Sequence, residues 1–234
     1  MTPPVFPPLF TGLDAERADP FALACAKAAE VCDAGLVCHD LGNDRLRAAM
    51  VFAPEVPLRD AACMLPLCGV GLQNALGALA PPEVAVHLGW GGEVYLNGGR
   101  CGAMQIAAAT ADPDAIPDWL VVGLTLDLWP PSQDTGLMPD ATALYAEGCG
   151  DINPTTLLEA WVRHTLLQIN AWDDGGPARL HRDWPAVAHG LNSEMVAGGD
   201  KGTFIGVDER LGLLLKTKKA TRLIPLTALL TEPA

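Results

Sequence analysis

The feature that most constrains the fold is an Asn-Gly turn between two apolar runs in the middle of the chain. Asn97-Gly98-Gly99 separates residues 93–96 from residues 101–109. Asn-Gly readily adopts the left-handed conformations of a tight hairpin turn, so the two runs predict paired antiparallel strands. The apolar run LVVGLTLDL at residues 120–128 predicts a further, central strand. The middle of the chain is therefore expected to form a β-sheet.

Helical patterns flank and interrupt these strands. Asp19-Pro20 and Asn153-Pro154 each supply an N-cap residue followed by a proline suited to the first helical turn. Alternation of such helices with hairpins predicts an α+β domain with a mixed or antiparallel sheet and helices on one side. Helices are expected at 19–32, at 58–77 with a break near Gly69-Val70-Gly71, at 154–172 and at 180–189, and further strands at 36–40, 46–53 and 84–90.

The last part of the chain differs from the rest. Residues 1–184 contain 9 basic and 23 acidic residues, a charge of −14, whereas residues 185–234 contain 6 and 5, a charge of +1. Short apolar runs at 194–197, 202–208, 212–216 and 221–225 alternate with turns, which is typical of a small antiparallel β-barrel. We therefore predict two domains, residues 1–188 and residues 189–234.

Charge and composition exclude several classes of partner. The net charge is −13, which argues against nucleic acid and against anionic membranes as partners. No secretory signal and no run of 18 apolar residues is present, so we expect a cytoplasmic protein without a membrane span. The seven cysteines lack C-x-x-C spacing and are expected to be reduced thiols without a metal. Cys38 and His39 are adjacent on a predicted strand and should point to opposite faces.

Four segments resemble motifs of one enzyme family. Residues 89–104, GWGGEVYLNGGRCGAM, resemble the signature hairpin of biotin protein ligases: Lys-Trp-Pro-Asn-Asp, a few apolar residues, a turn, and a lysine before a glycine-containing strand. Residues 121–128 resemble its Gly-Ile-Gly-Ile-Asn-Val strand, residues 141–144 its Ala-Thr-Ser-Leu motif, and residues 202–215 its C-terminal Src-homology-like β-barrel. Because the order of the motifs is kept over nearly the whole chain, the sequence resembles a biotin or lipoate protein ligase.

The resemblance implies a two-step ligase. Such an enzyme joins biotin or lipoate to ATP, with magnesium, and a lysine of an acyl-carrier domain then attacks the acyl adenylate. This chemistry needs cations on the carboxylate and phosphate oxygens and an acidic residue near the nucleophile. The matching positions are Arg100 and Glu93 as catalytic residues, and Trp90, Gly102, Arg45, Arg47, Gly123 and Asp127 as ligand-binding residues.

Several of these positions depart from the family pattern. The long Gly-Arg loop is reduced to a short turn that leads into Arg45 and Arg47, and Gly89 stands at the first motif lysine. Asp127 replaces an asparagine and would repel a phosphate unless a cation lay between them. Arg100 keeps the charge of the hairpin lysine and adds a fork suited to carboxylate or phosphate.

Three functions stay open on this sequence. The first is an ATP-dependent ligase with an altered substrate. The second is a degenerate relative that binds a small carboxylic acid, an acyl adenylate or an acyl carrier without catalysis, and loss of the Gly-Arg loop favours it. The third is a protein-interaction module, and any of the three is compatible with a homo-oligomer. Trp90 also fits a core aromatic residue, and Glu93, Arg45 and Arg47 fit solvated side chains.

Overall fold

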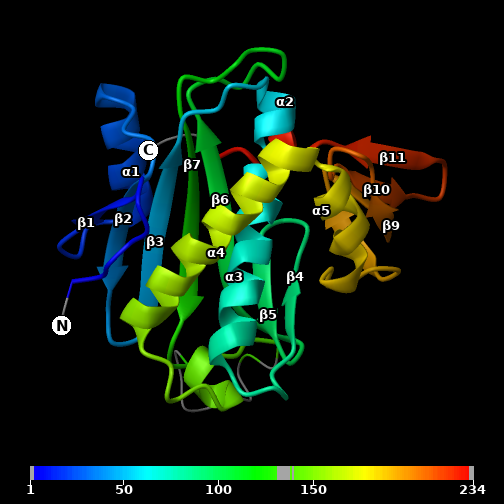
Figure 1. Cartoon of the computed structure of the whole chain (residues 1–234). Coiled ribbons are helices and arrows are strands. Elements are labelled where there is room, and N and C mark those ends of the chain that lie inside the picture. The colour runs from blue at the N-terminus through cyan, green and yellow to red at the C-terminus, as the bar shows by residue number, and fades with distance from the viewer. Residues whose placement is uncertain (1–2, 131–137, 139, 232–234) are drawn as a thin grey trace.

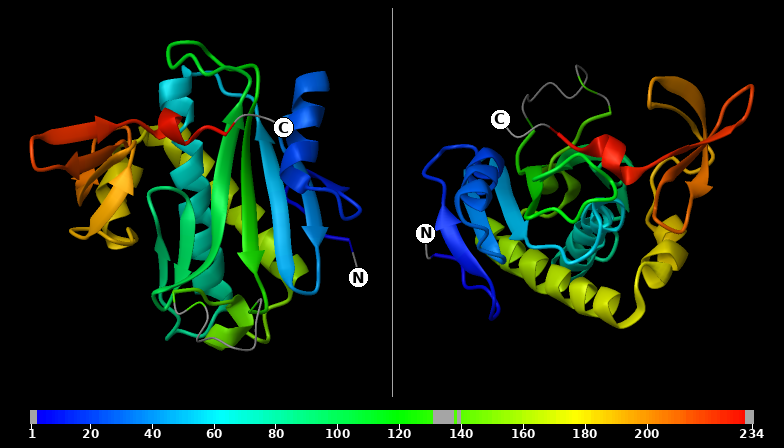
Figure 2. Two further views of the ribbon diagram at one scale, coloured as in Figure 1. Left: turned by 180° about the vertical axis from the view of Figure 1, so that it is seen from behind. Right: turned by 90° about the horizontal axis from the view of Figure 1, so that it is seen from above.

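The structure is a computed structural model that describes residues 3–130, 138 and 140–231. It contains a seven-stranded sheet and a separate four-stranded sheet near the C-terminus (Figure 1). Helices α3 and α4 cover one face of the large sheet, whereas α1 packs on the opposite face at one end only (Figure 2). The expected α+β class is therefore confirmed, but the helices lie on both faces of the sheet rather than on one.

The large sheet has the strand order β1-β2-β3-β7-β6-β5-β4. Its β1–β2 pair is parallel, and all other neighbouring strands in it are antiparallel. The strands are β1 Thr11–Asp14, β2 Leu36–Leu41, β3 Arg45–Phe52, β4 Val86–Leu88, β5 Glu93–Leu96, β6 Gly99–Ala108 and β7 Leu120–Asp127.

The two predicted hairpins are confirmed. Asn97 and Gly98 have φ values of 49° and 90°, so both turn residues between β5 and β6 adopt the left-handed region that Asn-Gly favours. A short turn joins β2 to β3 in the same way. Strand β1 escaped prediction because its four residues TGLD carry no apolar alternation, and its place depends on parallel pairing with β2.

The helices begin at the predicted caps. Asp19 Oδ1 accepts a hydrogen bond from the Phe21 amide, and Asn153 Oδ1 accepts one from the Thr155 amide. The helix expected at 58–77 is broken, but after Ala61 rather than at the glycines near residue 70, which lie inside α3. The helices are α1 Pro20–Glu30, α2 Leu58–Ala61, α3 Met64–Leu79, α4 Pro154–Gly175 and α5 Ala178–Asp183, with 3-10 turns at Leu144–Glu147, Trp184–Ala186 and Leu226–Leu229.

The C-terminal strands form an open antiparallel sheet of order β11-β10-β9-β8 rather than the expected closed barrel. The apolar inner face of this sheet is buried without closing into a barrel. Its residues Phe204, Leu213 and Ile224 belong to the same hydrophobic cluster as the core of the large sheet. The prediction of a closed Src-homology-like barrel is therefore wrong, and these strands form an open sheet that shares its core with the rest of the chain. The strands are β8 Glu194–Ala197, β9 Asp200–Val207, β10 Leu213–Lys216 and β11 Thr221–Ile224.

One strongly apolar helical segment of the described chain belongs to the core. Residues Leu58–Leu79 are long and apolar enough to cross a membrane by composition, with a window of mean hydropathy 1.4. Of that window, 61% is buried inside the structure, as expected for a core helix. The segment packs between the large sheet and α4.

Candidate functional site

The candidate site is the part of the large sheet that faces away from α3 and α4. Because successive strand residues point to opposite faces, the register of the sheet determines which side chains share this surface. Phe21 of α1 covers it at Gly123, whereas no helix lies over β5 and β6 (Figure 2). We call this surface the open face, and its residues are Arg45, Arg47, Glu93, Tyr95, Arg100, Ala103, Gln105, Thr125 and Asp127.

Both arginines of the shortened β2–β3 hairpin are neutralised by carboxylates. Arg45 Nε donates to Asp127 Oδ1 at 2.7 Å, directly across the β3–β7 pair. Arg47 donates to Asp40 Oδ2 from Nη2 at 2.5 Å and from Nε at 3.2 Å. Asp40 went unnoticed in the sequence, because its pairing with Arg47 follows only from the β2–β3 register. The repulsive Asp127 is thus the partner of a cation rather than a bare charge.

Glu93 occupies the space that a motif lysine would need. Glu93 pairs with Ala103 across β5 and β6, and its carboxylate lies against the preceding turn at Gly89 and Gly91. A Cβ on Gly89 would collide with Glu93 Oε2, and a Cβ on Gly91 would lie 2.8 Å from Oε1. A larger side chain at either glycine would therefore displace the carboxylate. The acidic position of the motif is kept, but no lysine stands beside it.

Arg100 is exposed on the open face. Its backbone is held by hydrogen bonds with Asp140 and Thr142, both 2.8 Å long. Its side chain makes no ion pair with any residue that the structure describes. Among the described residues, the guanidinium is therefore an exposed cation without a carboxylate partner.

Tyr95 and His189 form an aromatic wall next to Arg100. Tyr95 pairs with Arg100 across β5 and β6, and its ring stacks on His189 with centroids 3.6 Å apart and planes 11° from parallel. Burial raises the pKa of Tyr95, Glu93 raises it further, and Arg100 lowers it. Burial lowers the pKa of His189, as does nearby His87. The pair was missed in the sequence because His189 lies almost 100 residues after Tyr95.

Trp90 and Gly102 lie on the core side of the sheet. Trp90 is 6% exposed, and its indole N–H donates to the Leu211 carbonyl oxygen at 2.8 Å. Gly102 faces the backbone of β7, where a Cβ would collide with the Thr125 carbonyl oxygen. Gly123 lies under α1, where a Cβ would be 2.6 Å from Phe21 Cδ2. Trp90 also lines a small cavity together with Gly89, Gly92 and Glu93. Contact between Trp90, Gly102 or Gly123 and a ligand stays a prediction.

Cysteine and metal chemistry find no support at this surface. All seven cysteines are free, and burial raises the pKa of Cys25 and Cys38 to about 11, which disfavours a thiolate. Within the described ranges, no group of three or more His, Cys, Asp or Glu side chains is arranged to hold a metal. Arg45 and Arg47 are engaged by Asp127 and Asp40, which leaves less positive charge on the open face for the phosphates of a nucleotide.

Comparison with known proteins identifies the family of this chain. The model of the biotin/lipoate A/B protein ligase family matches residues 6–186. The chain belongs to that family. Residues 194–232 match a second model, described as a domain of unknown function, DUF4444. The family resemblance seen in the sequence is thereby confirmed.

Individual relatives agree with the family assignment. The biotin–[acetyl-CoA-carboxylase] ligase of Paracoccus denitrificans is 22% identical over 183 residues, which cover 75% of each chain. A biotin protein ligase-like protein of unknown function from Silicibacter sp. TM1040 is 57% identical, with a TM-score of 0.92 over 98% of this chain and 100% of its own. The biotin protein ligase of Aquifex aeolicus is 16% identical, with a TM-score of 0.73 over 92% and 96%, and therefore shares the fold.

Proposed function

We propose that this family member binds a small carboxylic acid of the biotin or lipoate class at Arg100 and does not adenylate it. The charge of the open face supports this. Arg45 and Arg47 are bound to Asp127 and Asp40, and Gly89 adds no cation. Arg100 is therefore the cation of this face that keeps no carboxylate partner among the described residues.

One guanidinium suits a carboxylate better than a nucleotide. Its planar fork donates two parallel hydrogen bonds to the two carboxylate oxygens. A triphosphate carries several negative charges and needs several cations or a metal to balance them. The stacked rings of Tyr95 and His189 offer the flat apolar surface against which the rest of such an acid would lie. An acyl-carrier domain that bears the same acid is the matching protein partner.

The test combines a binding measurement with an exchange assay. Biotin and lipoate are titrated into the full chain by calorimetry, and we expect one of them to bind. Arg100→Ala should remove this binding, and Arg100→Lys should weaken it by about tenfold, because the fork is lost while the charge stays. Arg163→Ala, which removes an exposed arginine on α4, is the matched control and should bind like the original chain.

The exchange assay separates binding from catalysis. ATP–pyrophosphate exchange should stay at background with either acid, under conditions in which an authentic biotin ligase gives a signal. Exchange that depends on biotin or lipoate would show an active ligase instead. Absence of binding to both acids would reject the small-molecule function altogether.

A second candidate function is a protein-interaction module. The outer face of the C-terminal sheet exposes Val196, Ile205 and Leu223, which are 69%, 40% and 52% exposed. Exposed apolar groups that gather on one sheet face are typical of an interaction surface. If neither acid binds, a crosslinking experiment that compares the original full chain with Leu223→Asp tests this candidate. The charged variant should lose a specific partner that is crosslinked to the original chain.

A further inference from the structure

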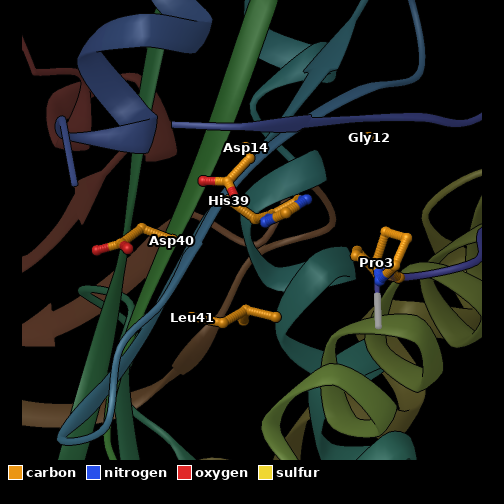
Figure 3. Close-up of a pocket in the computed structure, with 7 residues that line it drawn as sticks. Pro3, Gly12, Asp14, His39, Asp40 and Leu41 are labelled. Atoms are coloured by element: carbon orange, nitrogen blue, oxygen red, sulfur yellow. The ribbon is translucent and has the colours of Figure 1, made fainter. Parts of the chain in front are cut away.

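A cavity lies at the β1–β2 edge of the sheet, beneath the N-terminal segment. Its volume is about 420 Å³, within the range of small-molecule sites. The parallel register places Asp14 beside His39, and His39 shares a face with Ala48, opposite to the face of Arg47. The cavity lies at the β1–β2 end of the sheet, and β3 and β7 separate it from Arg100 on β6. The lining residues, most of them labelled in Figure 3, are Pro3, Pro4, Gly12, Asp14, His39, Asp40 and Leu41.

His39 is a buried polar side chain that the fold does not satisfy. The residue is 6% exposed, yet neither ring nitrogen makes a hydrogen bond to the described residues. Buried polar groups in folded proteins are nearly always paired. Among the described residues, the ring nitrogens of His39 do not belong to the side-chain atoms that are both fully buried and without a hydrogen-bond partner. They are therefore accessible at the cavity that His39 lines. In Figure 3 the imidazole and the Leu41 side chain both point toward Pro3.

Gly12 and the Phe6 ring both lie next to the imidazole. A Cβ on Gly12 would lie 3.5 Å from His39 Nε2 and 2.8 Å from Phe6 Cε2. The Phe6 ring therefore packs against Gly12 on the side where His39 Nε2 lies, with the Phe6 and His39 ring centroids 6.4 Å apart. The cavity that His39 lines supplies the free volume that a group hydrogen-bonded to an accessible ring nitrogen would require.

The polar lining of the cavity favours a cation. Burial lowers the pKa of His39, so the ring is neutral near pH 7.5 and offers one acceptor nitrogen. Asp14 Oδ1 accepts a hydrogen bond from the Glu16 amide at 2.8 Å, and its second oxygen has no partner among the described residues. In Figure 3 the carboxylates of Asp14 and Asp40 both lie on the side opposite to the one toward which the imidazole points, and Asp40 is engaged by Arg47, whereas Asp14 makes no ion pair with a described residue. No lysine or arginine is among the seven lining residues.

We propose that this cavity binds a small alkylammonium ion, with Asp14 balancing its charge and His39 accepting one of its N–H bonds. The apolar chain of the ion packs against the prolines at positions 3 and 4 and against Leu41. An anion would meet the Asp14 carboxylate, and a neutral alcohol would leave that charge unbalanced. The proposal does not depend on acid binding at Arg100, because the cavity lies at β1 and β2 and two strands, β3 and β7, separate it from β6.

The test uses three probes of similar shape on the full chain near pH 7.5: n-butylammonium, n-butanol and butyrate, each titrated by NMR with the His39 imidazole signals as readout. We expect saturable binding of butylammonium and affinities at least about tenfold weaker for the other two. Asp14→Asn keeps an oxygen for the Glu16 amide but removes the charge, and should weaken butylammonium binding by about tenfold. Asp118→Asn, at an exposed carboxylate between β6 and β7, is the matched control and should bind like the original chain.

Three results would overturn the proposal. They are the absence of saturable butylammonium binding, equal affinities for butylammonium and butanol, and equal affinities of Asp14→Asn and the original chain. Asp14 is exposed, so the variant is expected to fold, and its amide spectrum checks this directly. A shift of the imidazole signals that is the same with all three probes would also count against the site.

Discussion

His39 makes the stability of the fold depend on pH. Burial lowers the pKa of its imidazole below the ordinary value of 6.5, and the nearby Asp14 and Asp40 only partly oppose this. As the pH falls through 6.5, His39 becomes protonated in the unfolded chain while it stays neutral in the folded chain. Protonation therefore stabilises the unfolded chain, and the free energy of unfolding falls. We expect lower stability in urea at pH 5.5 than at pH 7.5, and a smaller difference in His39→Gln. Equal differences in both proteins would show that His39 does not cause the loss.

The arginines of the open face show what residue types can and cannot predict. Arg45, Arg47 and Asp127 were recognised as individual candidates because each stands at a family motif position. Their ion pairs were not predictable, because the Arg45–Asp127 contact joins residues 82 positions apart in sequence and depends on the β3–β7 register. Such a register is a property of the whole sheet, so chemistry that depends on it cannot be obtained from motifs alone.

The packing of α3 on α4 explains why a glycine pair did not break the helix. A Cβ on Gly71 would lie 3.0 Å from both the Cα and the backbone N of Thr165, so Gly71 allows the two helices to approach closely. Gly71→Ala should therefore destabilise the protein by about 1–3 kcal/mol, measured by urea unfolding. Gly77→Ala in the same helix meets nothing within 4 Å and should stabilise it by about 0.5–1 kcal/mol. Equal effects of the two substitutions would contradict the packing argument.

Elements with a local signal were predicted, and elements that depend on distant partners were not. The caps at Asp19 and Asn153 and the Asn97-Gly98 turn act over a few residues, and all three were found in the sequence. The position of strand β1 depends on its pairing with β2, and the open shape of the C-terminal sheet depends on its packing against the rest of the core. Gly71 was read as a helix breaker because the residue that needs its small size, Thr165, belongs to another helix.

At the scale of the whole molecule, polar contacts join the turn between β9 and β10 to the rest of the chain. Trp90 donates to the Leu211 carbonyl oxygen at 2.8 Å, and Arg210 pairs with Asp60 at 2.8 Å. Leu211 has a φ of 60°, which a residue with a side chain rarely adopts without support from its surroundings. The turn between β9 and β10 is therefore fixed in part by the indole of Trp90, a residue of the family's signature motif.

Trp90→Phe tests this connection, because it keeps an aromatic ring in the core and removes the N–H donor. The Leu211 carbonyl oxygen then loses its buried partner, at a cost of about 1–1.5 kcal/mol. If that cost falls on the attachment of the C-terminal sheet, the amides of β10 and β11 should exchange with solvent roughly tenfold faster, while those of β3 and β7 keep their rates. Trp129→Phe, at a tryptophan that is 56% exposed, is the control and should change neither set. Equal acceleration in both sheets would mean that the chain opens as one cooperative unit and that Trp90 stabilises the whole core rather than the junction.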